Sequence, residues 1–141
     1  MLAGVMAVHD VDASVAFYIE KLGFTSDGKL AGPDGKAIFG NARMGEHAHF
    51  MFNGYHDPIL NTGKRGLGVE FHITLPDEIN LDALYARFQQ NAVTIAAPMK
   101  EEYWGERRFT ITDPDGYFIS FVKQVKQVSM EEMESHTKQG E

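Results

Sequence analysis

The fold is predicted from the stretch WGERRFTITDPDGYFISF, residues 104–121. Apolar and polar residues alternate up to Thr112, the four residues Asp113-Pro-Asp-Gly116 follow, and a second apolar run begins at Tyr117. Proline fixes φ, aspartate side chains accept hydrogen bonds from nearby backbone N–H groups, and glycine tolerates positive φ, so these four residues favour a tight turn. The stretch therefore predicts a β-hairpin.

Length and composition limit the class of protein. The 141 residues fit one domain, and 43% hydrophobic with 23% charged residues is a globular composition. No apolar run is long enough to cross a bilayer, and the N-terminus lacks the features of a signal peptide, so we expect no membrane partner and a cytoplasmic location. The absence of cysteine excludes disulfides, thiolate catalysis and cysteine-bound zinc.

The charge of the chain argues against a nucleic-acid partner. The formal net charge of −7 repels phosphate backbones and anionic membranes. The nearest thing to a basic patch, Arg107-Arg108, is flanked by Glu101, Glu102 and Glu106. A small cationic or aromatic molecule is a more natural partner for such a surface.

The first half of the chain predicts the element order βαβββ. A buried strand is expected at residues 2–8, followed by a helix with Asp10 or Asp12 as its N-cap and Gly23 as the glycine after its C-terminus. Three more strands are expected at residues 24–30, 36–42 and 47–53, before a connecting loop at 55–64.

The second half repeats this order. A helix capped by Asn80 is expected to end at Asn91 in the left-handed conformation, and both residues lie 68 positions after Asp12 and Gly23. The strands around this helix are expected at residues 67–75, 93–97, 107–112 and 117–123.

The repeat predicts an α+β fold in which two βαβββ modules form an eight-stranded mixed sheet, which the family resemblance described below implies to be cupped. A single module would leave one sheet face and its edges uncovered, so two modules are expected to pair. The capping-box pattern from Ser129 to Glu132 indicates a short C-terminal helix. The expected boundaries are one domain at 1–125, with module one at 1–61 and module two at 66–125, and a polar tail at 126–141.

Five motifs resemble the glyoxalase, bleomycin-resistance and extradiol-dioxygenase superfamily, the vicinal oxygen chelate proteins. The resemblance runs over residues 2–125 and is nearest to the bleomycin-resistance branch. It implies paired modules around a cup, in a homodimer with ligand sites near the subunit boundary, with side-by-side and swapped module pairing both open. The motifs are Asp10-Val-Asp-Ala-Ser-Val-Ala-Phe17-Tyr18, Lys21-Leu-Gly-Phe24, Asp82-Ala-Leu-Tyr-Ala-Arg-Phe88, Trp104-Gly105 and Asp113-Pro-Asp-Gly116.

The same resemblance implies four metal-ligand positions with His, Glu or Gln side chains. In this sequence they fall near Ala3, Met51, Glu70 and Ser120, so at most Glu70 remains as a clear ligand. We therefore expect no metal and no other cofactor, because the positions lack convergent donors. The alternative is a divalent ion held by a displaced set of His49, Glu70 and His72.

The cup itself is expected to be aromatic and apolar with a few polar groups. Strand alternation places the candidate ligand-binding side chains on its inner face, and Trp104 either packs at the rim or stacks on a planar ligand. The candidate ligand-binding residues are His49, Met51, Asn53, Glu70, His72, Trp104, Phe118 and Ser120.

No catalytic constellation stands out, so we favour binding over catalysis. The predicted function is metal-independent binding of a small molecule, such as an antibiotic or a metabolite that the protein sequesters. One alternative is a metal-dependent lyase or dioxygenase that uses the displaced His/Glu set. The other is a structural or regulatory dimer whose cup is vestigial.

Overall fold

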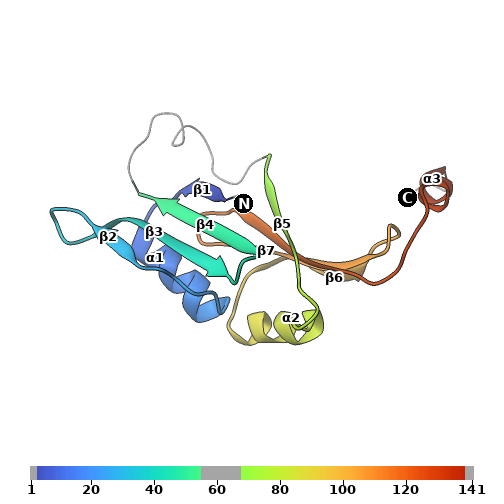
Figure 1. Ribbon diagram of the computed structural model, residues 1–141, viewed down its shortest axis with the longest axis horizontal. Helices are drawn as coiled ribbons and strands as arrows, with labels where there is room; N and C mark the ends of the chain where they lie inside the picture. The colour runs from blue at the N-terminus through green and yellow to red at the C-terminus, as the bar shows by residue number, and fades with distance from the viewer. Residues whose placement is uncertain (1–2, 55–67, 139–141) are drawn as a thin grey trace.

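Eight strands form two four-stranded mixed sheets, and three helices complete the fold (Figure 1). The structure is a computed structural model, and it describes residues 3–54 and 68–138. Sheet A has the strand order β1-β4-β3-β2, and sheet B has the order β5-β8-β7-β6. The elements are β1 (Gly4–Ala7), α1 (Val11–Ala16), the π-helical turn η1 (Phe17–Lys21), β2 (Lys29–Ala31), β3 (Ala37–Met44), β4 (Ala48–Asn53), β5 (Glu70–Thr74), α2 (Leu81–Gln90), β6 (Ile95–Glu101), β7 (Glu106–Thr112), β8 (Phe118–Gln124) and α3 (Met130–Lys138).

The two sheets have the same internal pairing. In each one the first strand runs parallel to the last, β1 to β4 and β5 to β8, and the other pairs are antiparallel. The predicted α+β class and the repeated βαβββ order are confirmed. The predicted hairpin is also present as β7 and β8, since the Gly116 N–H donates to the Asp113 carbonyl at 3.0 Å.

Helices α1 and α2 both begin at a predicted N-cap. The Asp10 carboxylate accepts from the Ala13 N–H at 3.0 Å, and the Asn80 side chain accepts from the Ala83 N–H at 2.8 Å. Of the two aspartates considered for the first cap, Asp10 is therefore the cap. The two caps lie 70 positions apart, so the expected offset of 68 is wrong at this end.

The helix C-termini differ by one residue. Gly23 has a φ of +78°, as predicted, whereas Asn91 has a φ of −85° and the left-handed residue is Ala92, at +57°. The prediction for Asn91 is therefore wrong. Asp10 and Gly23 are 13 positions apart and Asn80 and Ala92 only 12, and the additional residue of module one falls where η1 widens the helix into a π turn.

Two expected strands have different limits. The strand expected at 24–30 is reduced to β2 and one bridge at Thr25, because the Asp27 N–H donates to the Asn41 side chain at 2.9 Å instead of to a strand partner. The strand expected at 93–97 is β6, which begins two residues later and continues through Pro98 to Glu101. β6 tolerates this proline because it is an edge strand of sheet B.

The core lies between the helices and one face of each sheet. Helix α1 packs on β3 and β4, and α2 packs on β8. The opposite face of each sheet carries neither of these helices, and we call it the open face. No helix of residues 3–54 and 68–138 is long and apolar enough to cross a membrane. The core aromatics are Tyr18, Phe24, Phe50, Phe52, Phe88, Phe109 and Phe121.

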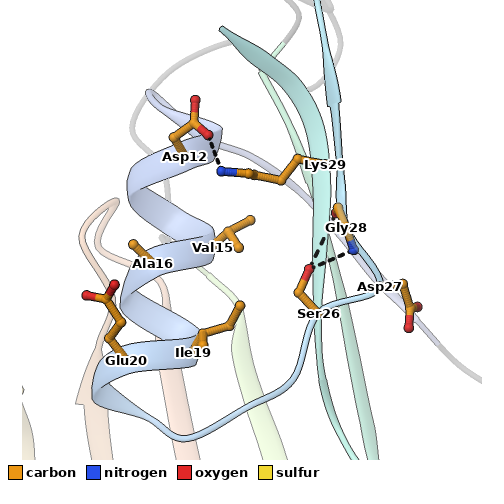
Figure 2. Close-up of a pocket in the computed structure, with 9 residues that line it drawn as sticks. All are labelled: Asp12, Val15, Ala16, Ile19, Glu20, Ser26, Asp27, Gly28 and Lys29. Carbon is orange, nitrogen blue, oxygen red and sulfur yellow. Dashed lines mark hydrogen bonds and ion pairs between the residues drawn. The ribbon is translucent and has the colours of Figure 1, made fainter.

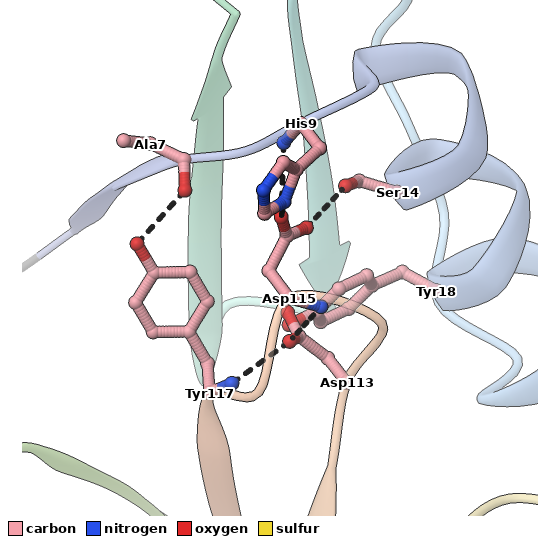
Figure 3. Close-up of polar contacts among 7 residues, drawn as sticks. All are labelled: Ala7, His9, Ser14, Tyr18, Asp113, Asp115 and Tyr117. Carbon is pink, nitrogen blue, oxygen red and sulfur yellow. Dashed lines mark hydrogen bonds and ion pairs between the residues drawn. The ribbon is translucent and has the colours of Figure 1, made fainter. Parts of the chain in front are cut away.

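The turn between β7 and β8 holds the two modules together (Figure 3). Its two aspartates are almost fully buried: Asp113 is 5% exposed, and the Asp115 side chain is 3% exposed. The Tyr18 hydroxyl, from η1, donates to Asp113 at 2.8 Å, and His9 lies 2.5 Å from Asp115 through Nδ1 and donates to it from its backbone N–H at 2.9 Å. Because such groups must be satisfied when they are buried, the turn fixes where module one sits against module two.

Burial also sets the ionisation of this contact. Desolvation raises the pKa of Asp113, against the lowering effect of the hydrogen bonds from the Tyr117 N–H and the Tyr18 hydroxyl. The same burial, together with the negative charge of Asp113, raises the pKa of Tyr18 well above 10.0. Tyr18 is therefore a permanent donor to the carboxylate.

We predict that Asp113 makes the protein less stable as the pH rises above about 3.8, its ordinary pKa. Because its pKa is raised in the folded state, the native protein holds this proton more tightly than the unfolded chain, and that stabilisation is lost as pH rises through the folded pKa. Asp113→Asn should remove this component. Free energies of unfolding measured in urea between about pH 3.5 and 7 test this, because that range begins just below the ordinary pKa of aspartate. Asp34→Asn, in an exposed turn, is the matched control. Identical pH profiles for wild type and Asp113→Asn would contradict the prediction.

Candidate functional site

A closed hydrogen-bond network lies on the open face of sheet B. At its centre the Ser120 hydroxyl is fully buried, accepts from Nη2 of Arg108 at 2.8 Å and lies 2.7 Å from the Thr110 hydroxyl. Ser120 also donates to the Glu70 carboxylate, which accepts from Arg108 as well. A serine hydroxyl has a single proton, so Thr110 must be the donor in its contact with Ser120.

A second polar group continues along the same sheet. The Glu106 carboxylate accepts from the Trp104 indole N–H at 2.5 Å, and its other oxygen lies 3.7 Å from Nε2 of His72. Trp104 is half-buried, and the Tyr103 ring meets it edge-on at 5.0 Å and 85°. The indole is therefore held in a fixed orientation at the end of β7.

Strand alternation explains why these side chains share a face. Along β7, Glu106, Arg108 and Thr110 alternate with Phe109 and Ile111, which are buried in the core. On β8 the half-buried Phe118 lies two residues before Ser120, so it belongs to the same face.

Sequence reasoning found four of the seven residues of these two polar groups and missed the other three. Glu70, His72, Trp104 and Ser120 were predicted. In the structure, Glu70 and Ser120 are bonded to each other, and Trp104 and His72 both contact Glu106. Glu106, Arg108 and Thr110 were missed, although the same two-residue period that selected Ser120 runs through β7. Arg108 was considered only as part of a possible basic patch with Arg107.

The other predicted residues lie on the open face of sheet A. His49, Met51 and Asn53 alternate along β4 with Phe50 and Phe52, which are buried against the helices. All three are half-buried. The predicted ligand-binding residues therefore fall into two groups, one on each sheet.

Two hollows are compared with these groups, and only the first contains residues of the network. One, of about 260 Å³, lies where the pairing of β6 with β7 slips around Pro98, and Arg108 and Thr110 of the network line it. The other, of about 390 Å³, lies on the helix side between α1 and residues 26–29 (Figure 2). In the second hollow, Lys29 pairs with Asp12 at 2.6 Å, away from both open faces. We therefore associate the first hollow with the candidate site.

The residues at the implied metal positions do not fit a divalent ion. Glu70 is the only one with a carboxylate, and this group already binds Arg108 and Ser120. Within residues 3–54 and 68–138, no three His, Asp or Glu side chains are close enough together to hold a metal. The displaced set is also divided, since His49 lies on sheet A and Glu70 and His72 on sheet B.

The paired βαβββ modules, each with one open sheet face, define a class of two-module proteins. The chain belongs to the Glyoxalase/Bleomycin resistance protein/Dioxygenase superfamily, whose family model matches residues 3–121. This result confirms the resemblance stated from the sequence motifs.

Individual relatives agree with this membership. An uncharacterized protein of Mycobacterium bovis is 27% identical, over 92% of this chain and 87% of that protein. The bleomycin resistance protein of Geobacillus stearothermophilus is 28% identical, over 86% of this chain and 94% of that protein. The structure of TnmS3, an antibiotic binding protein from Streptomyces sp. CB03234, matches with a TM-score of 0.63 and 20% identity, over 88% of this chain and 96% of that chain, and supports the fold.

We predict that the protein purified without chelator carries less than about a tenth of an equivalent of Fe, Zn, Ni or Mn, because the donors do not converge. Elemental analysis measures this directly. His49→Ala and Glu70→Ala are the informative variants, and His136→Ala in α3 is the control. Stoichiometric metal that disappears with either of the first two substitutions would contradict the prediction.

Proposed function

We propose that this protein binds a small molecule without a metal ion and sequesters it, and that the ligand is an antibiotic or a metabolite with a cationic or aromatic group. The proposed ligand-binding surface is the open face of the two sheets. Within it, Trp104, Phe118, Glu70 and His72 line the sheet B side, and the buried Ser120 holds Glu70 in place through its hydrogen bond. His49, Met51 and Asn53 line the sheet A side.

The observation that carries this proposal is the bonding of Ser120. Its one donor and both acceptor sites are used within the protein, by Glu70, Arg108 and Thr110. A network satisfied in this way holds its side chains in place, and it offers neither a free nucleophile nor a vacant metal ligand at that position. This favours recognition of a molecule over its chemical conversion.

Two further features support a planar or cationic ligand. The Trp104 indole is held by Glu106, so its ring is positioned as a wall for stacking. The net charge of −7 attracts cations and raises their rate of association. The names of two relatives, a bleomycin resistance protein and an antibiotic binding protein, suggest the compounds to test first. We further propose that the protein acts in the cytoplasm as a homodimer.

Titration with metal-free bleomycin tests the proposal. Trp104 is the single tryptophan, so stacking on it should quench the whole indole fluorescence, and the melting temperature should rise with ligand. At a ligand concentration 100 times the Kd, the stabilisation should be about 2.7 kcal/mol. Trp104→Ala should weaken binding by about 2 kcal/mol, which the melting temperature reports without fluorescence. Tyr85→Phe, on α2, is the control.

Other outcomes separate the alternatives. A flat response to bleomycin and to a panel of aromatic amines would contradict the proposal and favour a dimer with a vestigial cup. Binding or turnover that appears only after a divalent metal is added would favour the metal-dependent lyase or dioxygenase.

A further inference from the structure

One buried polar atom lacks a partner. Within residues 3–54 and 68–138, Nδ1 of His49 is the buried side-chain nitrogen or oxygen that has no hydrogen bond. His49 lies on the open face of sheet A, at a strand position rather than in a flexible terminus. Buried polar groups without partners are rare in native proteins, so this one requires an explanation.

The neighbouring Asn41 is fixed in one orientation. Its Oδ1 accepts from the Asp27 N–H at 2.9 Å and from the Ser26 hydroxyl at 3.1 Å, and its Nδ2 donates to the Asp27 carboxylate at 2.7 Å. Asn41 is only 7% exposed. Turning the amide over would place its oxygen against the carboxylate and its nitrogen against the Asp27 N–H, which can only donate, so the assignment of the amide follows from its partners.

The carboxylate that orients Asn41 is itself stabilised in its ionised form. Nε of Arg43 donates to Asp27 at 2.7 Å. The hydrogen bonds from Arg43 and then from Asn41 lower the pKa of Asp27. An ionised carboxylate accepts but does not donate, so Nδ2 of Asn41 stays a donor.

This orientation determines where His49 carries its proton. Nε2 of His49 lies 3.2 Å from Nδ2 of Asn41. Because Nδ2 is a donor, Nε2 has to accept, and in the neutral ring the proton then sits on Nδ1. The unpartnered atom is therefore an N–H donor without an acceptor. Burying such a donor carries a desolvation penalty that no hydrogen bond offsets.

We propose that the ligand supplies the missing acceptor, and that Asn41 is the positioning residue that holds His49 with Nδ1–H as the donor. The inference rests on the proposed function and adds the chemistry of the ligand: an accepting oxygen of the carbonyl or carboxylate type, next to an apolar body. The apolar body is expected because Val5, opposite Met51, and Phe39, opposite Asn53, are on the same face and are 46% and 37% exposed. On binding, this oxygen replaces the groups that cover Nδ1 in the free protein.

The tautomer is tested first, without any ligand. Long-range ¹H–¹⁵N spectra of the labelled protein distinguish a protonated from an unprotonated ring nitrogen, and His49→Asn identifies the signals of this residue. The expected result is a protonated Nδ1 and an unprotonated Nε2. In the double variant Asp27→Asn/Asn41→Asp, which avoids two facing carboxylates, the new carboxylate accepts, and the proton should move to Nε2. A proton on Nε2 in the wild type would overturn the inference.

The donor is then tested with metal-free bleomycin, whose amide carbonyls supply accepting oxygens. Asparagine places its N–H₂ near the position of Nδ1, whereas glutamine reaches the position of Nε2. His49→Asn should therefore bind within about twofold of wild type, and His49→Gln about threefold to tenfold more weakly, the range expected for one hydrogen bond.

The outcomes are separable from those of the proposed function. Wild-type binding with an unchanged Kd in His49→Gln would overturn the role of His49 and leave small-molecule binding intact. No binding by the wild type would overturn the proposed function and, with it, the role of His49 toward a ligand. Circular dichroism and the melting temperature of each variant establish that it is folded.

Discussion

The buried turn from Asp113 to Asp115 is the contact on which the arrangement of the two modules depends. Two carboxylates with almost no exposed surface come from module two: Asp115 accepts from His9 of module one, and Asp113 accepts from Tyr18 of module one and from two N–H groups of its own turn. A buried carboxylate without donors would be strongly destabilising, so the modules cannot separate without a large cost. The Tyr117 hydroxyl adds a further bond, to the Ala7 carbonyl at 2.8 Å.

This arrangement leaves one face of each sheet free for function, and the two faces differ. The open face of sheet B is polar, and its bonds close on themselves through Ser120 and Glu106. The open face of sheet A carries apolar side chains and, in the described part of the chain, one buried donor without an acceptor. A ligand on the sheet B face would stack on a rigid aromatic wall, and a ligand on the sheet A face would satisfy that donor. The Trp104 ring and the His49 donor can both take part in binding, and neither is a reactive group.

The sequence predicted the fold well because its signals are local. Aspartate, asparagine and glycine at helix ends and the Asp-Pro-Asp-Gly turn each act within a few residues, and apolar alternation identifies the core face of a strand. The predictions fail where a distant side chain competes with the backbone. The strand at 24–30 is interrupted because Asn41, from another strand, binds the Asp27 N–H. The left-handed residue is Ala92 rather than Asn91 because the expected spacing was counted from Asp12, whereas the first helix begins at Asp10; the spacing from N-cap to left-handed residue is 13 in module one and 12 in module two.

The candidate site was predicted only in part for a related reason. Period-two reasoning on one strand places Ser120, but the partner of Ser120 depends on strand register, which pairs Thr110 with Ser120 and Arg108 with Val122. That register is not visible in the residues themselves. The tautomer of His49 is even harder to predict from the sequence, since it depends on three successive contacts among Asp27, Asn41 and His49.

Metal-free recognition at the Trp104 face is the central claim, and one spectrum tests it most directly. The single tryptophan gives a single indole ¹H–¹⁵N signal, and its N–H is bonded to Glu106. During titration with metal-free bleomycin in the presence of EDTA, this signal should shift progressively and saturate. A signal that stays unchanged under EDTA and moves only after a divalent metal is restored would contradict the account.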